Sequence, residues 1–131
     1  SDLRLLLPTD DEVDALLLRR AIALHRLHDP AAPAAAQALQ ARFDAAQQRG
    51  ETTHAREQAR LALDIQGNAA AALALAQANW ARQKEPADAL LLLRTALAAG
   101  RPDAAEPVRR LVRQGGWIDV RLAALDRSLQ P

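Results

Sequence analysis

The stretch that decides the fold is residues 55–88, which read AREQARLALDIQGNAAAALALAQANWARQKEPAD. It contains two helix-forming segments rich in alanine and leucine, separated by Gly67 and Asn68, which are typical of turns. Arg60 and Arg94 each precede an alanine by two residues, and they are 34 residues apart. A period of 34 residues is typical of stacked helical hairpins, in which each hairpin buries its apolar face against the next. The sequence therefore predicts repeated helix–turn–helix units.

A third copy of this pattern occurs nearer the N-terminus. Arg19-Arg20-Ala21-Ile22 is similar to Arg60-Leu61-Ala62-Leu63 and to Arg94-Thr95-Ala96-Leu97. The spacing from Arg19 to Arg60 is 41 residues, seven more than the repeat. Seven residues correspond to about two helical turns. We therefore expect the first hairpin to be longer than the other two by this amount.

Prolines, glycines and capping residues divide the chain into about seven helices. We expect these helices at about 11–27, 30–49, 52–66, 69–84, 87–99, 102–114 and 117–129. Pro107 lies inside the sixth and must either kink it or delay its start. The first six helices pair into hairpins at about 11–49, 51–84 and 87–114. The seventh is expected to cap the stack, and the whole chain, 1–131, is read as one domain.

The composition favours an all-α fold. The chain has 131 residues, of which half are apolar but only 2% are aromatic. It contains 32 alanines and 23 leucines. Both are strong helix formers, whereas the β-branched and aromatic residues that favour strands are scarce. We expect a core in which helices approach closely over alanines and leucines fill the remaining space.

Charge and cysteine content exclude several classes of function. Seventeen basic and sixteen acidic residues give a net charge of +1, which does not favour nucleic-acid binding. No apolar run approaches twenty residues, so no membrane insertion is expected. Lys84 is the only lysine among many arginines, a bias typical of GC-rich bacterial genomes. The absence of cysteine fits either a bacterial cytoplasm or a periplasm.

The 34-residue unit is similar to the tetratricopeptide repeat, over about Ala55 to Asp88. Leu61-Ala62 lies where the family has a leucine and a small residue in its first helix. Ala74 and Ala81 lie at the small, close-approach positions of the second helix. Pro86 lies where a proline ends the unit.

The chain departs from the family where Gln58, Ile65 and Ala78 replace large, often aromatic residues, so it resembles a degenerate, alanine-rich version. The resemblance implies an α-solenoid of three hairpins. It also implies that the concave face of the solenoid holds an extended peptide or a helix of a partner protein.

No set of residues favours catalysis or a metal site. Serine occurs only at Ser1 and Ser128, and no Gly-rich phosphate loop is present. His25 and His28 share one side of a helix, but His54 belongs to another hairpin, and a zinc site needs three or four ligands. We therefore expect neither enzyme activity nor a cofactor.

The two tryptophans, Trp80 and Trp117, are interpreted as wedges between hairpins rather than as ligand platforms.

The arginines are the best candidates for a binding site. Arg19, Arg60 and Arg94 occupy equivalent positions in three successive hairpins, and equivalent positions in a solenoid line up along one face. Arg56 adds a charge one turn before Arg60. The aliphatic residues expected beside this row are Ile22, Leu63 and Leu97. Neighbouring guanidiniums repel each other, so the row would favour a ligand with acidic and apolar groups.

Two other interpretations remain open at this point. The arginines can instead solvate a helix surface, with Arg60 pairing with Asp64 or Glu57. The chain can also be a self-associating scaffold segment, because the leucines from Leu3 to Leu7 give the N-terminal edge an apolar surface that another copy or upstream repeats would cover. The expected function is a non-catalytic peptide-binding module, with this scaffold as the alternative and an accessory domain of an enzyme as a third.

Overall fold

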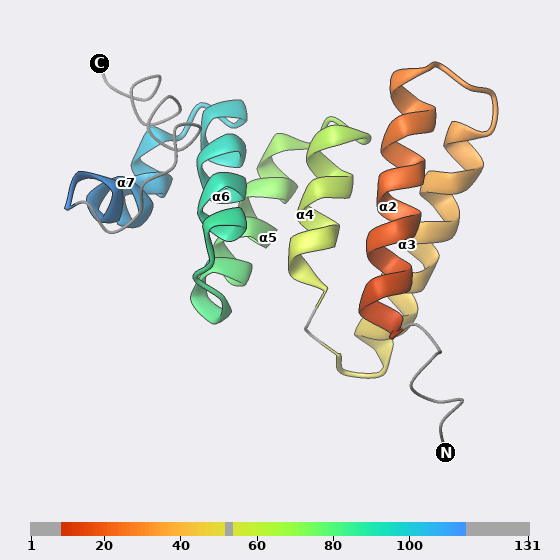
Figure 1. Ribbon diagram of the computed structural model, residues 1–131, viewed down its shortest axis with the longest axis horizontal. Helices are drawn as coiled ribbons and strands as arrows, with labels where there is room; N and C mark the ends of the chain where they lie inside the picture. The colour runs from red at the N-terminus through yellow and green to blue at the C-terminus, as the bar shows by residue number, and fades with distance from the viewer. Residues whose placement is uncertain (1–8, 52–53, 115–131) are drawn as a thin grey trace.

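The computed structural model describes residues 9–51 and 54–114, and these ranges contain six α-helices and no strand (Figure 1). The helices are α2 (Asp10–Arg26), α3 (Ala32–Gln48), α4 (Ala55–Asp64), α5 (Ala69–Arg82), α6 (Pro86–Ala98) and α7 (Glu106–Arg113). A short 3-10 helix, η1 (Pro102–Ala105), precedes α7. The expectation of an all-helical chain is confirmed for these residues. The expected seventh helix at 117–129, with Trp117, and the leucines Leu3 to Leu7 lie outside them.

Local sequence explains where the helices begin and end. Thr9 caps α2, and its side chain accepts a hydrogen bond from the Glu12 amide while Glu12 accepts one from the Thr9 amide. Gly67 follows α4 with a φ of 64°, a conformation that glycine adopts without steric cost. Pro107 lies in the first turn of α7, where its missing amide hydrogen costs nothing. Pro107 therefore delays the start of the helix, and the residues before it form η1.

Helix α4 is shorter than the expected 52–66. It begins at Ala55, with His54 at the capping position, and its last residue is Asp64. The amides of Gln66 and Asn68 bond back to the carbonyls of Leu61 and Ala62, at 3.1 and 2.9 Å. These bonds end the helix early, since Asn68 must leave it in order to cap α5.

The first hairpin is the longest of the three, as its spacing predicts. Helices α2 and α3 each have 17 residues, whereas α4 and α5 have 10 and 14. The extra residues therefore lengthen both helices of the first hairpin.

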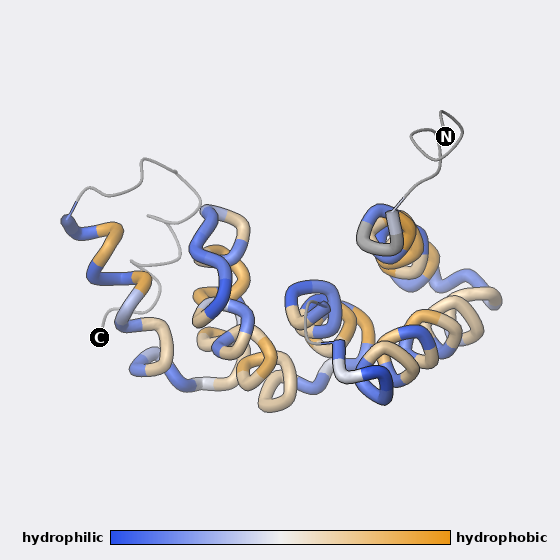
Figure 2. Tube along the Cα trace, turned by 90° about the horizontal axis from the view of Figure 1, so that it is seen from below, coloured by the Kyte–Doolittle hydropathy of each residue, from blue (hydrophilic) through white to orange (hydrophobic). Residues whose placement is uncertain are grey.

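The hairpins lie side by side along the molecule (Figure 1). Figure 2 shows α2, α4 and α6 on one side of the row, with α3 and α5 on the other. Helix α4 contacts both α2 and α6, so the three helices form a continuous surface. No helix in the described ranges combines the length and apolar character that crossing a membrane requires.

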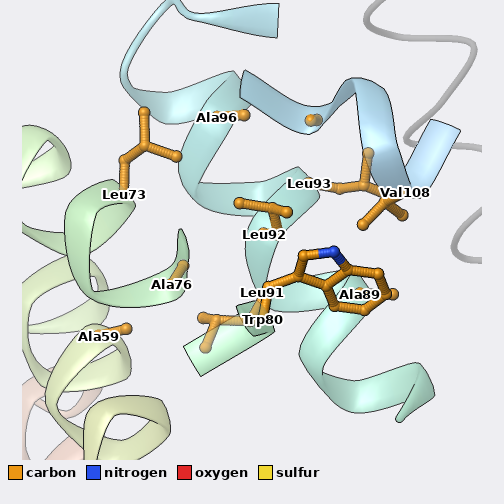
Figure 3. Close-up of a cluster of buried hydrophobic side chains, with 11 residues drawn as sticks. Ala59, Leu73, Ala76, Trp80, Ala89, Leu91, Leu92, Leu93, Ala96 and Val108 are labelled. Atoms are coloured by element: carbon orange, nitrogen blue, oxygen red, sulfur yellow. The ribbon is translucent and has the colours of Figure 1, made fainter. Parts of the chain in front are cut away.

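The buried side chains form two clusters. The first contains Leu18, Ile22, Leu39, Phe43 and Leu61, from α2, α3 and α4. The second extends from α4 to α7 and is rich in alanine and leucine (Figure 3).

In the second cluster Ala76, Ala89 and Ala96 have no exposed surface, so the helices approach closely there. Trp80 fills the space beside Val108, which confirms its expected role as a wedge between hairpins.

Candidate functional site

Two adjoining hollows lie on the surface formed by α2, α4 and α6. The larger, of about 550 Å³, is lined by Ala15 of α2 and by residues of α4 and α6 that include Arg60, Leu90 and Arg94. The smaller, of about 420 Å³, is lined by Leu63, Asp64, Arg94, Leu97 and Ala98. Arg94 borders both hollows, and together they are called the groove below.

At the centre of the groove, one carboxylate lies between two guanidiniums. An Nη of Arg94 donates a hydrogen bond of 2.5 Å to Oδ1 of Asp64. The Nε of Arg60 lies 3.7 Å from Oδ2 of the same carboxylate, which is too far for a hydrogen bond. Oδ2 is buried and accepts no hydrogen bond. Asp64 therefore fixes Arg94 and holds Arg60 only loosely.

Arg60 is the guanidinium that is available to a ligand. Its side chain is 37% exposed, and no hydrogen bond joins it to any part of the chain that the structure describes. A guanidinium carries five N–H donors in a planar fork that matches a carboxylate. The side chain of Arg94 is similarly exposed, at 36%, but it is already bonded to Asp64.

Arg56 has a structural role at one end of the groove. Its Nε and an Nη donate hydrogen bonds of 2.7 and 2.9 Å to the two oxygens of Asp88, which is fully buried at the start of α6. Asn79 of α5 and the backbone amide of Glu85 also donate to Asp88, at 2.7 and 3.1 Å. This carboxylate therefore joins α4, α5 and α6.

The hydrogen bonds around Asp88 determine its ionisation. Burial raises the pKa of the Asp88 carboxyl, but the hydrogen bonds from Arg56, Asn79 and the Glu85 amide outweigh it and leave the pKa below its ordinary value. The same hydrogen bond to Asp88 raises the pKa of the Arg56 guanidinium, against the opposing effect of burial. Both groups are therefore charged at neutral pH.

The structure brings Arg60 and Arg94 together, as the repeat predicts, along with Leu63 and Leu97. Arg19 is exposed on α2 and does not line either hollow. Ala15, one helical turn before Arg19, does line the larger hollow, so Arg19 lies beyond its edge on the same side of α2.

Ile22 requires a correction. It was expected beside the arginines as a ligand contact, but it is only 5% exposed and lies in the first core cluster with Leu18 and Leu61. Its equivalent in the third hairpin, Leu97, is 43% exposed. The two positions differ because Ile22 lies among side chains of α3 and α4, whereas Leu97 borders an open hollow.

The expectation that the guanidiniums repel one another without a ligand is also wrong for the groove. Arg60 and Arg94 share Asp64, although no acidic residue lies one turn from Arg94 in the sequence. Arg56 is neutralised by Asp88 and by Glu85, whose carboxylate is 3.1 Å away. The groove is therefore close to electrically neutral, with its accessible positive charge at Arg60.

Sequence reasoning missed a second polar cluster, where the first hairpin meets α4. Asp14 of α2 is buried and accepts a hydrogen bond of 2.7 Å from Nε of Arg42 on α3. Its other oxygen lies 3.1 Å from Nδ1 of the buried His54. The signal was available, because Asp14 falls four residues before Leu18 on the buried stripe of α2.

Glu51 completes this cluster. Its carboxylate lies 3.4 Å from Nε2 of His54, and Arg49 donates to it at 3.0 Å. The hydrogen bonds from Arg49 and His54 lower the pKa of the Glu51 carboxyl. Donors and acceptors within the cluster bond to one another and join the helices, and the same residues line a hollow of about 160 Å³. No group of three potential metal-ligating side chains occurs within residues 9–51 and 54–114.

No protein-family model, curated protein or solved structure matches the chain. The function of the groove must therefore be argued from its own chemistry.

Proposed function

We propose that the groove binds an extended peptide segment of a partner protein, and that the chain is a non-catalytic module similar to a tetratricopeptide-repeat solenoid. The observation that carries the proposal is the Arg60 guanidinium, which is exposed in the larger hollow of the groove and makes no hydrogen bond to the described residues. Side chains of this kind are recurrent anchors for carboxylates in peptide recognition.

The residues that line the groove favour a ligand in which apolar side chains flank the carboxylate. Leu63 and Leu97 line one side of Arg94, and Leu90 and Leu91 line the other. Leu97 keeps 43% of its surface exposed, and covering it with an aliphatic side chain would contribute favourably at about 25 cal/mol per Å² of apolar surface. We therefore propose a ligand with a carboxylate next to aliphatic side chains.

The test uses an acetylated and amidated heptapeptide with one central glutamate flanked by leucines. Calorimetric titration should give saturable binding to the native chain. Arg60→Ala should weaken binding about tenfold or more, because a hydrogen bond to a charged group contributes roughly 1.5–3 kcal/mol before ordering costs. Binding should also weaken as salt shortens the Debye length below about 10 Å.

The matched control is Arg110→Ala. Arg110 is exposed on α7, outside the groove, so its removal changes the net charge equally and leaves the site intact. Equal affinities of the Arg60→Ala and Arg110→Ala variants for the peptide would refute the proposed role of Arg60. The absence of saturable binding to the native chain would refute the peptide-binding function.

A further inference from the structure

The position of Asp64 within the groove limits what a ligand can carry. Its side chain is 11% exposed, and it lies beneath guanidiniums that are each more than one-third exposed. Asp64 is the last residue of α4, and its bond to Arg94 of α6 fixes the carboxylate between the two helices. A bound peptide would therefore contact the guanidiniums directly and lie close to the Asp64 charge.

The carboxylates around the groove outnumber its guanidiniums by one. Three guanidiniums, those of Arg56, Arg60 and Arg94, are accompanied by the carboxylates of Glu57, Asp64, Glu85 and Asp88. No excess of positive charge remains that would attract a strongly acidic segment. The groove can still take one carboxylate at Arg60, because this guanidinium shares Asp64 with Arg94 and is not hydrogen-bonded to it.

A second acidic residue on the ligand would meet a different environment. An extended peptide advances by roughly 3.3–3.6 Å per residue. A carboxylate on the residue next to the bound glutamate would therefore lie within one Debye length, about 10 Å at 0.1 M salt, of Asp64. Glu57 also lines the groove, one turn before Arg60. Since Asp64 is mostly buried, its charge is screened less than that of a surface group. The second carboxylate would therefore be repelled and find no free guanidinium.

We infer that Asp64 is the specificity-determining residue of the groove, and that it restricts the ligand to a segment with a single isolated carboxylate flanked by aliphatic side chains. This inference rests on the proposed peptide-binding function. It assigns Asp64 a role beyond the folding contact with Arg94, because its negative charge would discriminate against ligands with several adjacent acidic residues.

The experiment compares three acetylated, amidated heptapeptides that share their flanking leucines and carry none, one or three glutamates at the centre. The native chain should bind the peptide with one glutamate several-fold more tightly than the peptide with none. The third peptide, with three glutamates, should bind no more tightly than the second. In Asp64→Asn, which keeps the shape of the side chain and removes its charge, the peptide with three glutamates should bind best, by about fivefold or more.

The control variant is Asp44→Asn, which removes the same charge from an exposed position on α3. It should keep the native order of affinities. If the native chain bound the three-glutamate peptide most tightly, the inference would be overturned and the peptide-binding function would stand. The same would follow if a folded Asp64→Asn variant kept the native order of affinities for the three peptides. Failure of all three peptides to bind would instead refute the proposed function and the inference with it. The native-chain comparison can overturn the inference even if Asp64→Asn does not fold.

Discussion

The two interfaces between successive hairpins differ in the size of the side chains that they bury. In the first interface, α2 and α3 pack against α4 through large side chains, with Phe43 and Ile22 beside Leu61. In the second interface, α4 and α5 pack against α6 mainly through alanines that have no exposed surface and through leucines, with Trp80 as the one large aromatic side chain among the buried residues of that cluster (Figure 3). Each interface also contains a buried aspartate, Asp14 in the first and Asp88 in the second.

The difference shows how the longer first hairpin can be joined to the shorter second hairpin. Small residues permit close approach, and so α4, α5 and α6 pack closely over Ala59, Ala76 and Ala89. The longer first hairpin has fewer such positions, and its contact with α4 depends on an aromatic ring and on the Asp14–His54 pair. The groove lies mainly over the second interface, and the first hairpin contributes only Ala15 to its lining.

The largest effect is expected from removing the aromatic ring of the first interface. Phe43 is 1% exposed and its ring lies 6.0 Å from that of His54. Phe43→Ala should lower the free energy of unfolding by about 3–5 kcal/mol, as measured by urea denaturation. Hydrogen exchange should show that α2 and α3 lose protection first, while α5 and α6 retain theirs.

The counterpart in the second interface is Leu92→Ala, because Leu92 is equally buried. It should cost about 2–5 kcal/mol and reduce the protection of α5 and α6. The same exchange pattern in both variants would show that the two interfaces do not differ in the way described.

A smaller effect is expected at the buried aspartate of the second interface. Asp88→Asn removes a buried charge that accepts from Arg56 and Asn79, and it should cost about 3 kcal/mol at pH 7. Because the pKa of Asp88 is lower in the folded chain than in the unfolded one, the ionised group stabilises the fold above the unfolded pKa, about 3.9. This contribution is lost as the pH falls through the folded value.

Urea denaturation between pH 7 and pH 2 would therefore show a steeper acid loss of stability for the native chain than for Asp88→Asn. Parallel curves for the two proteins would contradict the stabilising role of the ionised carboxylate.

The helices and their pairing could be predicted from the sequence because they depend on local patterns. The repeat placed Arg60 and Arg94 on one face, and the spacing of Arg60 and Asp64 showed that they could pair. The bond from Arg94 to Asp64 could not be predicted, since its partners are 30 residues apart and meet only when two hairpins pack.

The role of Asp88 could have been recognised in part. Glu85, Pro86 and Asp88 have the spacing of a capping box at a helix start, which the structure confirms. The bond from Arg56 to the same carboxylate again depends on how two hairpins pack, so it could not be predicted from local sequence. The burial of Ile22 was missed because the repeat treats all three hairpins as equivalent, although the first hairpin packs differently.

The most direct test of the central claim is the position at which a peptide binds. In a ¹⁵N-labelled sample, the Nε–Hε resonance of Arg60 should shift on addition of the single-glutamate peptide. The backbone amides of Leu63 and Leu97, on the two sides of the smaller hollow, should shift with it. The backbone amide resonance of Arg110, on α7, should not shift. Shifts confined to α3 or α7, with the Arg60 resonance unchanged, would contradict the assignment of the α4–α6 groove as the binding site.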